Sequence, residues 1–76
     1  MKEYRFSKEK YLEYHKKNFN ELSEHIQNFL KECDNSLIDL ESKHYNPGWG
    51  YDVYNIVYSD WSIPCNKLEK YCIVED

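Results

Sequence analysis

The sequence predicts a small α+β domain, in which one long amphipathic helix packs on a short antiparallel β-hairpin and a brief helix follows near the C-terminus. Two patterns favour this fold class: apolar residues recur with helical spacing over residues 8–33, and a β-branched and aromatic run occupies residues 51–58. The 76 residues are expected to form one domain, residues 1–76. A small all-α fold, with residues 36–43 and 51–60 helical, is the alternative.

Residues 8–33 carry the long helix, because their apolar side chains follow a heptad pattern. The helix is expected to end at the turn-forming residues 34–36. A straight helix of this length would extend about 39 Å, whereas a compact chain of this size has a diameter of roughly 30 Å. Either the helix breaks near residues 18–20, or its apolar stripe continues against a second molecule. The stripe residues expected to mediate self-association are Leu12, Phe19, Leu22, Ile26 and Phe29.

Capping signals mark the beginning of two helices. Ser7 is a suitable N-cap for the long helix, and Phe6 can pack on Tyr11 across its first turn. Asn66 and Glu69 have the spacing of a capping box. We therefore expect a short helix of about two turns near the C-terminus.

The middle of the chain predicts the hairpin. Residues 36–43 are compatible with a short helix or a strand, and we favour the strand. The Asn-Pro-Gly turn at residues 46–48 leads into the predicted strand 51–58. Side chains alternate across a strand, and here both faces carry apolar groups. If the helix covers one face, the other remains as a tyrosine-rich surface edged by carboxylates, unless the C-terminal segment covers it as a second layer.

The charge of the chain is unevenly distributed. The net charge is −4, with +1 over residues 1–33 and −5 over residues 34–76, and no Lys or Arg lies between Lys43 and Lys67. An acidic field repels nucleic acid and attracts basic surfaces. We therefore expect a protein partner and no direct binding of nucleic acid.

The basic-free segment is also the most aromatic part of the chain. Residues 44–61, HYNPGWGYDVYNIVYSDW, contain six aromatic side chains and two acids. Tyr and Trp dominate interface hot spots, and carboxylates beside them suit an arginine-lined groove that normally holds nucleic acid. The alternative is that these rings simply form the core. The residues expected to bind a partner are Asp39, Glu41, Tyr51, Asp52, Tyr54, Tyr58, Asp60 and Trp61.

The residue types for metal or nucleophilic chemistry are present without the usual spacing. Cys33, Cys65, Cys72 and His44 could supply four metal ligands, but no cysteine pair has zinc-finger spacing. A Cys65–His44 nucleophile would need an orienting acid and a substrate pocket. His15 occupies the missing slot of the helical stripe and is expected to be packed. We expect no cofactor, no metal and no enzymatic activity.

The expected location is the cytoplasm. The opening segment MKEYRFSKEK has no apolar segment typical of a signal peptide, and no apolar run is long enough to span a bilayer. The odd number of cysteines favours reduced thiols.

The C-terminal stretch LEKYCIVED, residues 68–76, resembles an EKYCLVEE-like stretch in a small phage-encoded anti-CRISPR protein of the type II-C inhibitor group. The chain also agrees with the general profile of such inhibitors, which are tiny, cytoplasmic, acidic, aromatic-rich and without catalytic motifs. We expect a non-enzymatic protein-binding inhibitor, with an acidic tyrosine-rich face docked on a basic groove of a nucleic-acid-processing protein. A structural or assembly protein that self-associates through the helical stripe is the alternative.

Overall fold

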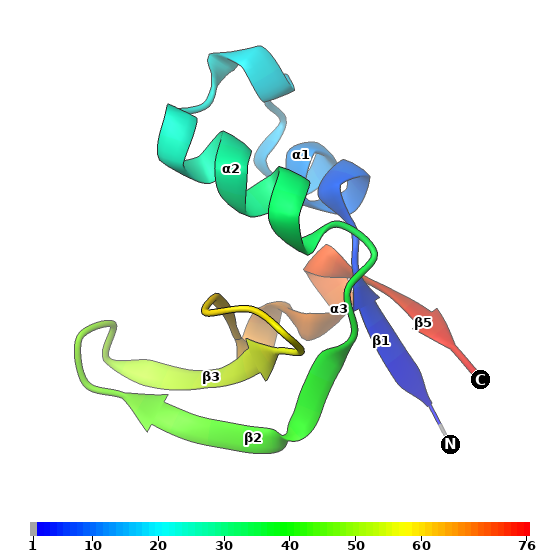
Figure 1. Cartoon of the computed structure of the whole chain (residues 1–76), viewed down its shortest axis with the longest axis vertical. Coiled ribbons are helices and arrows are strands. Elements are labelled where there is room, and N and C mark those ends of the chain that lie inside the picture. The colour runs from blue at the N-terminus through cyan, green and yellow to red at the C-terminus, as the bar shows by residue number, and fades with distance from the viewer. Residues whose placement is uncertain (1) are drawn as a thin grey trace.

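The computed structural model describes residues 2–76 and shows an α+β chain built from short elements. In chain order these are β1 (Glu3–Phe6), α1 (Lys8–His15), the 3-10 helix η1 (Phe19–Glu21), α2 (Glu24–Cys33), β2 (Ile38–Asn46), β3 (Tyr51–Ile56), β4 (Ser62–Pro64), the 3-10 helix η2 (Cys65–Lys67), α3 (Leu68–Tyr71) and β5 (Cys72–Glu75). In Figure 1, α1 and α2 lie above the strands, and the β2–β3 hairpin projects to the left. The predicted fold class is confirmed, whereas the predicted single long helix is wrong.

The expected helix over residues 8–33 is divided into α1 and α2. Lys16 adopts the left-handed conformation with a φ of 55°, and its N–H donates to carbonyls of the last turn of α1. The hydroxyl of Ser23 accepts from the backbone N–H of Ile26 at 3.3 Å and caps α2. The break anticipated near residues 18–20 is thus confirmed. An unbroken helix of about 39 Å would also exceed the longest dimension of the chain, 33 Å.

The beginning of α1 has the contacts that the sequence predicts. Ser7 Oγ accepts from the backbone N–H of Lys10 at 3.2 Å. The rings of Phe6 and Tyr11 lie with their centroids 6.1 Å apart. Helix α2 ends at Cys33, directly before the predicted turn residues.

The hairpin predicted for the middle of the chain is formed by β2 and β3. Asn46 Oδ1 accepts from the backbone N–H groups of Gly48 and Trp49 at 2.9 and 3.2 Å, which closes the turn. The strand over residues 51–58 is confirmed through Ile56, and the all-α alternative is wrong. Strand β4 pairs with the second edge of β3 and completes a three-stranded antiparallel sheet.

Strand β2 is bent, because its register with β3 shifts after Asp39. At the bend, Ser42 Oγ donates to the carbonyl of Asp39 at 2.6 Å and accepts from the N–H of Asn55 at 2.8 Å. Val53 and Ile56, which simple alternation puts on opposite faces of β3, are both buried. The predicted division into one covered face and one free face is therefore wrong.

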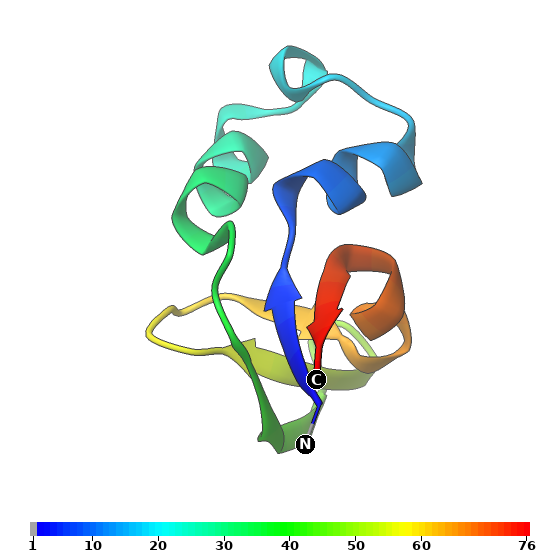
Figure 2. The ribbon, with the colours of Figure 1, turned by 90° about the vertical axis from the view of Figure 1, so that its right-hand side faces the viewer.

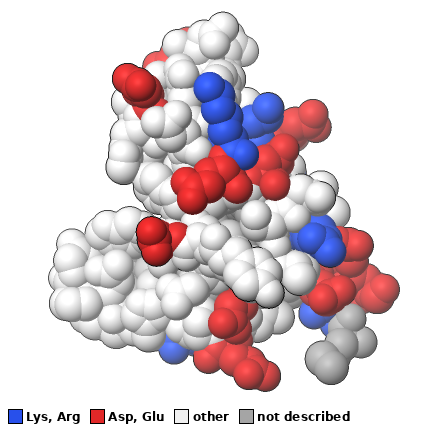
Figure 3. Space-filling view, in the orientation of Figure 1, with Lys and Arg blue, Asp and Glu red and all other residues white. Residues whose placement is uncertain are grey.

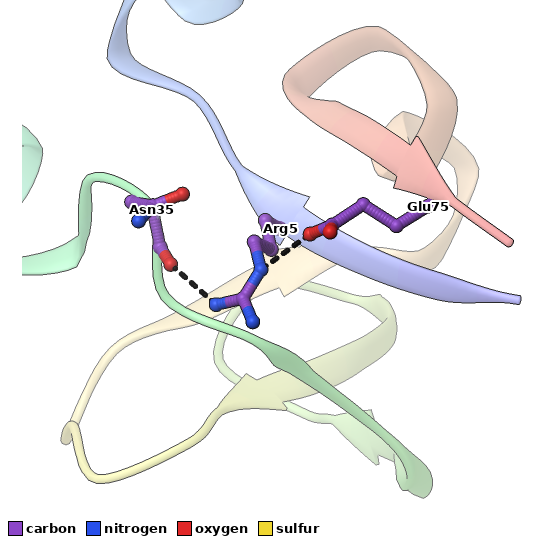
Figure 4. A network of polar contacts seen from close by, with 3 residues as sticks. All are labelled: Arg5, Asn35 and Glu75. Atoms are coloured by element: carbon purple, nitrogen blue, oxygen red, sulfur yellow. Dashed lines mark hydrogen bonds and ion pairs between the residues drawn. The ribbon is translucent and has the colours of Figure 1, made fainter.

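Strands β1 and β5 form a second, two-stranded antiparallel sheet that the sequence reading did not predict. Figure 2 shows these strands side by side, with the two termini close together. The guanidinium of Arg5 pairs with the carboxylate of Glu75 and donates to the carbonyl of Asn35 at 3.0 Å (Figure 4). Arg5 therefore links β1 both to β5 and to the loop that follows α2.

The brief helix near the C-terminus is present as η2 and α3. The predicted capping box of Asn66 and Glu69 is wrong, since α3 begins after Lys67 and has no side-chain cap. The backbone becomes extended at Cys72, with φ −123° and ψ 151°, and continues as β5.

One apolar core joins the helices to both sheets. Its buried members are Phe6, Phe29, Leu30, Cys33, Ile38, Ile56, Ile63, Tyr71 and Cys72. Among the stripe residues predicted to self-associate, Phe29 is buried in this core, and the other four pack against it as partly buried side chains. The structure therefore uses the helical stripe within the chain, and the self-association hypothesis stays a prediction.

Candidate functional site

The eight residues predicted to bind a partner do not share one surface. Tyr54 and Trp61 are partly buried against the core. Asp52 and Asp60 are exposed, and Tyr51 is 43% exposed. The structure thus assigns part of the predicted face to the core and leaves part of it to solvent.

The remaining three predicted residues, Asp39, Glu41 and Tyr58, lie at the end of the hairpin remote from its turn. Leu37 and Val57 line both of the shallow cavities at this end, one beside Tyr58 and one beside the two acids. Tyr58 is fully exposed, at 104% of its reference area, and has a left-handed φ of 60°. The same cavities are lined by Arg5 and Lys2 as well as by Glu32 and Glu3, so this end of the hairpin carries charges of both signs with an excess of acids. We call the part formed by Asp39, Glu41 and Tyr58 the acidic patch.

A cleft at the opposite end of the hairpin is lined by six Phe, Tyr and Trp rings, and we call it the aromatic cleft. It has a volume of about 250 Å³. Its lining consists of Tyr11, His25, Ile26, Phe29, Trp49, Tyr51, Trp61, Ser62, Ile63, Pro64 and Tyr71. Elements far apart in the sequence therefore meet there: α1, α2, the hairpin turn, β4 and α3.

The rings of the aromatic cleft fall into two groups. On the helical side, the Trp61 centroid lies 4.8 Å from those of both Phe29 and His25. On the hairpin side, Trp49 and Tyr51 lie 5.8 Å apart. Neither Trp49 nor Tyr51 belongs to the core cluster, so these two rings line the cleft without supporting the core.

Tyr11 and Tyr71 complete the aromatic lining, with their ring centroids 4.9 Å apart. Burial raises the pKa of Tyr71 to about 12 and also raises the pKa of Tyr11. The Tyr71 hydroxyl lies 2.9 Å from Nε2 of His15. The stripe predicted a packed histidine, whereas His15 is exposed and contacts the rings of Tyr11 and Tyr71 from the surface. Both phenols are therefore neutral near pH 7.

The aromatic cleft has no Lys or Arg among its lining residues in the described chain. Glu32 does not line the cleft either, but its Oε2 accepts from Nε1 of the lining residue Trp61 at 3.0 Å. Figure 3 shows a notch on its left side between the helices and the hairpin, and the surface around this notch is uncharged or acidic. Basic side chains in this view lie over the helices, on the right and at the lower edge of the molecule, away from the notch.

The three cysteines are free thiols. Burial raises the pKa of Cys72 to about 12 and also raises the pKa values of Cys33 and Cys65. These thiols are therefore protonated near pH 7, a state of low nucleophilicity. Within residues 2–76, no group of three or more His, Cys, Asp or Glu side chains could hold a metal ion.

Sequence reasoning missed most of the aromatic cleft. Trp49 lies in the aromatic segment 44–61, directly after the turn signal, but is not among the residues predicted to bind a partner. Tyr11 and Tyr71 fall in segments predicted to be helical, and Phe29 belongs to the stripe predicted to mediate self-association. No local pattern indicates that these four rings meet, because they come from four separate elements.

Comparison with family models, curated proteins and solved structures finds no match for this chain. No helix within residues 2–76 is long and apolar enough to cross a membrane.

Proposed function

We propose that this protein is a non-enzymatic binding protein that docks its aromatic cleft and the neighbouring hairpin on a cationic surface of a partner protein. The proposal extends to inhibition: the partner is a nucleic-acid-processing protein whose basic groove the chain occupies, in the cytoplasm of a host cell. The aromatic cleft carries this proposal, and the resemblance to a phage-encoded inhibitor supports its second part.

The observation that carries the binding proposal is the exposure of two large rings in a cleft without lining cations. Trp49 is 49% exposed and Tyr51 is 43% exposed, and neither packs into the core. A small chain gains stability by burying such rings, so leaving them half open has a cost in folding. Half-buried Tyr and Trp side chains at the edge of a pocket are typical of interface hot spots.

The inhibitor part of the proposal is supported by residues 68–76, the stretch that resembles the anti-CRISPR protein. This stretch forms α3 and β5, and Tyr71 within it lines the aromatic cleft. The acidic patch with Asp39, Glu41 and Tyr58 would add contacts to a basic groove at the other end of the hairpin.

Affinity capture with matched variants tests the binding proposal. The double variant Trp49→Ala/Tyr51→Ala removes both hairpin rings of the cleft and should remain folded. Tyr45→Ala is the control, because Tyr45 is 59% exposed on the same hairpin and does not line the cleft. We expect wild type and control to capture the same nucleic-acid-processing protein from a bacterial lysate, and the double variant to lose it.

Salt and activity separate the parts of the proposal. Contacts between an acidic surface and a basic groove should weaken as salt rises, because exposed charges are screened. The captured enzyme should lose activity when wild type is added and keep it when the double variant is added. Equal capture by the double variant would refute the aromatic cleft as the binding site, and capture without loss of activity would refute inhibition.

A further inference from the structure

We infer that the aromatic cleft binds a single cationic side chain of the partner, an arginine or a lysine. This inference rests on the proposed function and specifies the chemistry of its contact. It concerns one pocket and one side chain, and can therefore be tested with a small probe before the partner is known.

The ring faces of the aromatic cleft have the chemistry that holds a cation. The faces of Trp and Tyr rings are electron-rich and attract an ammonium or guanidinium group within about 6 Å of the ring centroid. Trp49 and Tyr51 provide one such pair on the hairpin, and Trp61 provides a third ring on the helical side. An arginine can also stack its planar guanidinium on a ring.

The charges at the cleft are complementary to a cation. Within the described residues, the lining contains no Lys or Arg, and the carboxylate of Glu32 is one hydrogen bond away: it accepts from the indole of Trp61 and itself lines the cavity beside Tyr58. Elsewhere in the described chain, lysines already lie over rings: Lys67 Nζ lies 4.7 Å from the centroid of Tyr14, and Lys8 Nζ lies 5.6 Å from that of Phe19. The described cation–ring contacts do not include the rings of the cleft. Among the exposed rings of the described chain, Tyr14 has a lysine over it, whereas Trp49 and Tyr51 are open to a cation from outside, as are Tyr45 and Tyr58, which do not line the cleft.

The size and apolar part of the cleft suit a long basic side chain. A volume of about 250 Å³ is below the usual range of drug-sized pockets and is too small for a helix or a hairpin. Ile26 and Pro64, which line the cleft and are partly exposed, offer apolar surface for an aliphatic stem. Arg and Lys commonly bury their stems in this way while the charged group remains near polar partners.

A peptide titration tests this inference on the intact chain. The probe is an acetylated and amidated Gly-Arg-Gly peptide, and the matched control replaces arginine by citrulline, which has nearly the same shape and no charge. The two indole N–H signals, from Trp49 and Trp61, report on opposite sides of the cleft in an NMR titration. We expect saturable shifts of both signals with the arginine peptide, and an affinity at least about tenfold lower for the citrulline peptide.

Variants identify the groups that make the contact. Trp49→Phe should keep measurable binding, because a ring face remains, whereas Trp49→Ala should abolish it. Glu32→Gln should weaken the arginine peptide and leave the citrulline peptide unchanged, and Tyr45→Ala should bind like wild type. The inference would be overturned if the two peptides bound equally well. It would also be overturned if neither indole signal shifted at peptide concentrations that saturate known cation–aromatic sites.

The outcomes also separate this inference from the proposed function. If partner capture depends on Trp49 and Tyr51 while the arginine peptide does not bind, the binding function stands and the single-cation contact is wrong. If the arginine peptide binds and no protein is captured, the cleft recognises cations but the proposed partner class is wrong.

Discussion

Replacing Phe6 by Ala should remove a large part of the stability of this protein. Phe6 is completely buried, and its ring centroid lies 4.9 Å from that of Phe29 and 6.2 Å from that of Tyr71. Its backbone pairs with Cys72 in the β1–β5 sheet and donates to the carbonyl of Ser36 at 2.8 Å. The ring of Phe6 therefore packs against residues of α2 and α3, while its backbone bonds to β5 and to the loop before β2.

The expected size follows from the burial of this ring. Truncating a buried Phe to Ala costs about 3–5 kcal/mol of unfolding free energy, through lost transfer energy and the cavity that remains. A chain of this length has a total stability of roughly 4–11 kcal/mol. A wild type near the lower limit would leave the variant unfolded at room temperature, whereas a wild type near the upper limit would leave it folded with roughly half to three quarters of its stability.

Urea denaturation followed by tryptophan fluorescence measures this loss. We expect a large decrease of the urea midpoint with an unchanged slope, which would indicate a loss of stability without a change in the surface exposed on unfolding. Tyr45→Ala, on the exposed side of the hairpin, should change the unfolding free energy by less than about 0.5 kcal/mol. A loss below about 1 kcal/mol for Phe6→Ala would refute the position of β1 at the centre of the fold.

Three further predictions concern pH, association and strain. Burial raises the pKa values of Tyr71 and Cys72 from 10.0 and 9.0 to about 12. Because the unfolded chain then loses these protons at lower pH than the folded chain, the free energy of unfolding should fall as pH rises from about 9 to 12. A urea midpoint that stays constant over this window would contradict their burial. Ile26→Asp should unfold the chain, as judged by circular dichroism, because Ile26 packs against the core of the same chain. If light scattering instead shows an oligomeric wild type and a folded, monomeric variant, the result would favour self-association through the stripe. Tyr58→Gly should increase the free energy of unfolding by up to about 1 kcal/mol and so raise the urea midpoint, because a left-handed φ is unfavourable for tyrosine and the exposed ring has no packing to lose. A midpoint below that of wild type would show that the ring of Tyr58 supports the fold.

The sequence predicted the elements that depend on neighbouring residues. The cap at Ser7, the end of α2, the turn at Asn46 and the strand β3 all follow from signals within a few positions. The break between α1 and α2 could only be placed approximately. It depends on Lys16 adopting the left-handed conformation, for which lysine has no special preference.

The elements that were missed depend on contacts between distant parts of the chain. Strand β1 pairs with β5 across almost the whole sequence, as the partners Glu3 and Glu75 show. Each of these strands has four residues, and either segment alone resembles the flank of a helix. The aromatic cleft was missed for the same reason, because its rings come together only in a fold in which α1 and α2 are separate helices.

The break in the helix is what connects the fold to the candidate site. Because α1 and α2 are separate, the chain can direct residues of both helices toward the strands, and Tyr11 and Phe29 meet Trp61 and Tyr71 there. In a straight helix of about 39 Å, part of the apolar stripe would have extended beyond the domain. The aromatic richness of this chain therefore has two explanations that apply to different residues. Core burial accounts for Phe29 and Tyr71, whereas the half-exposed rings of Trp49 and Tyr51 remain unexplained by folding and are the positions at which a partner should be sought first.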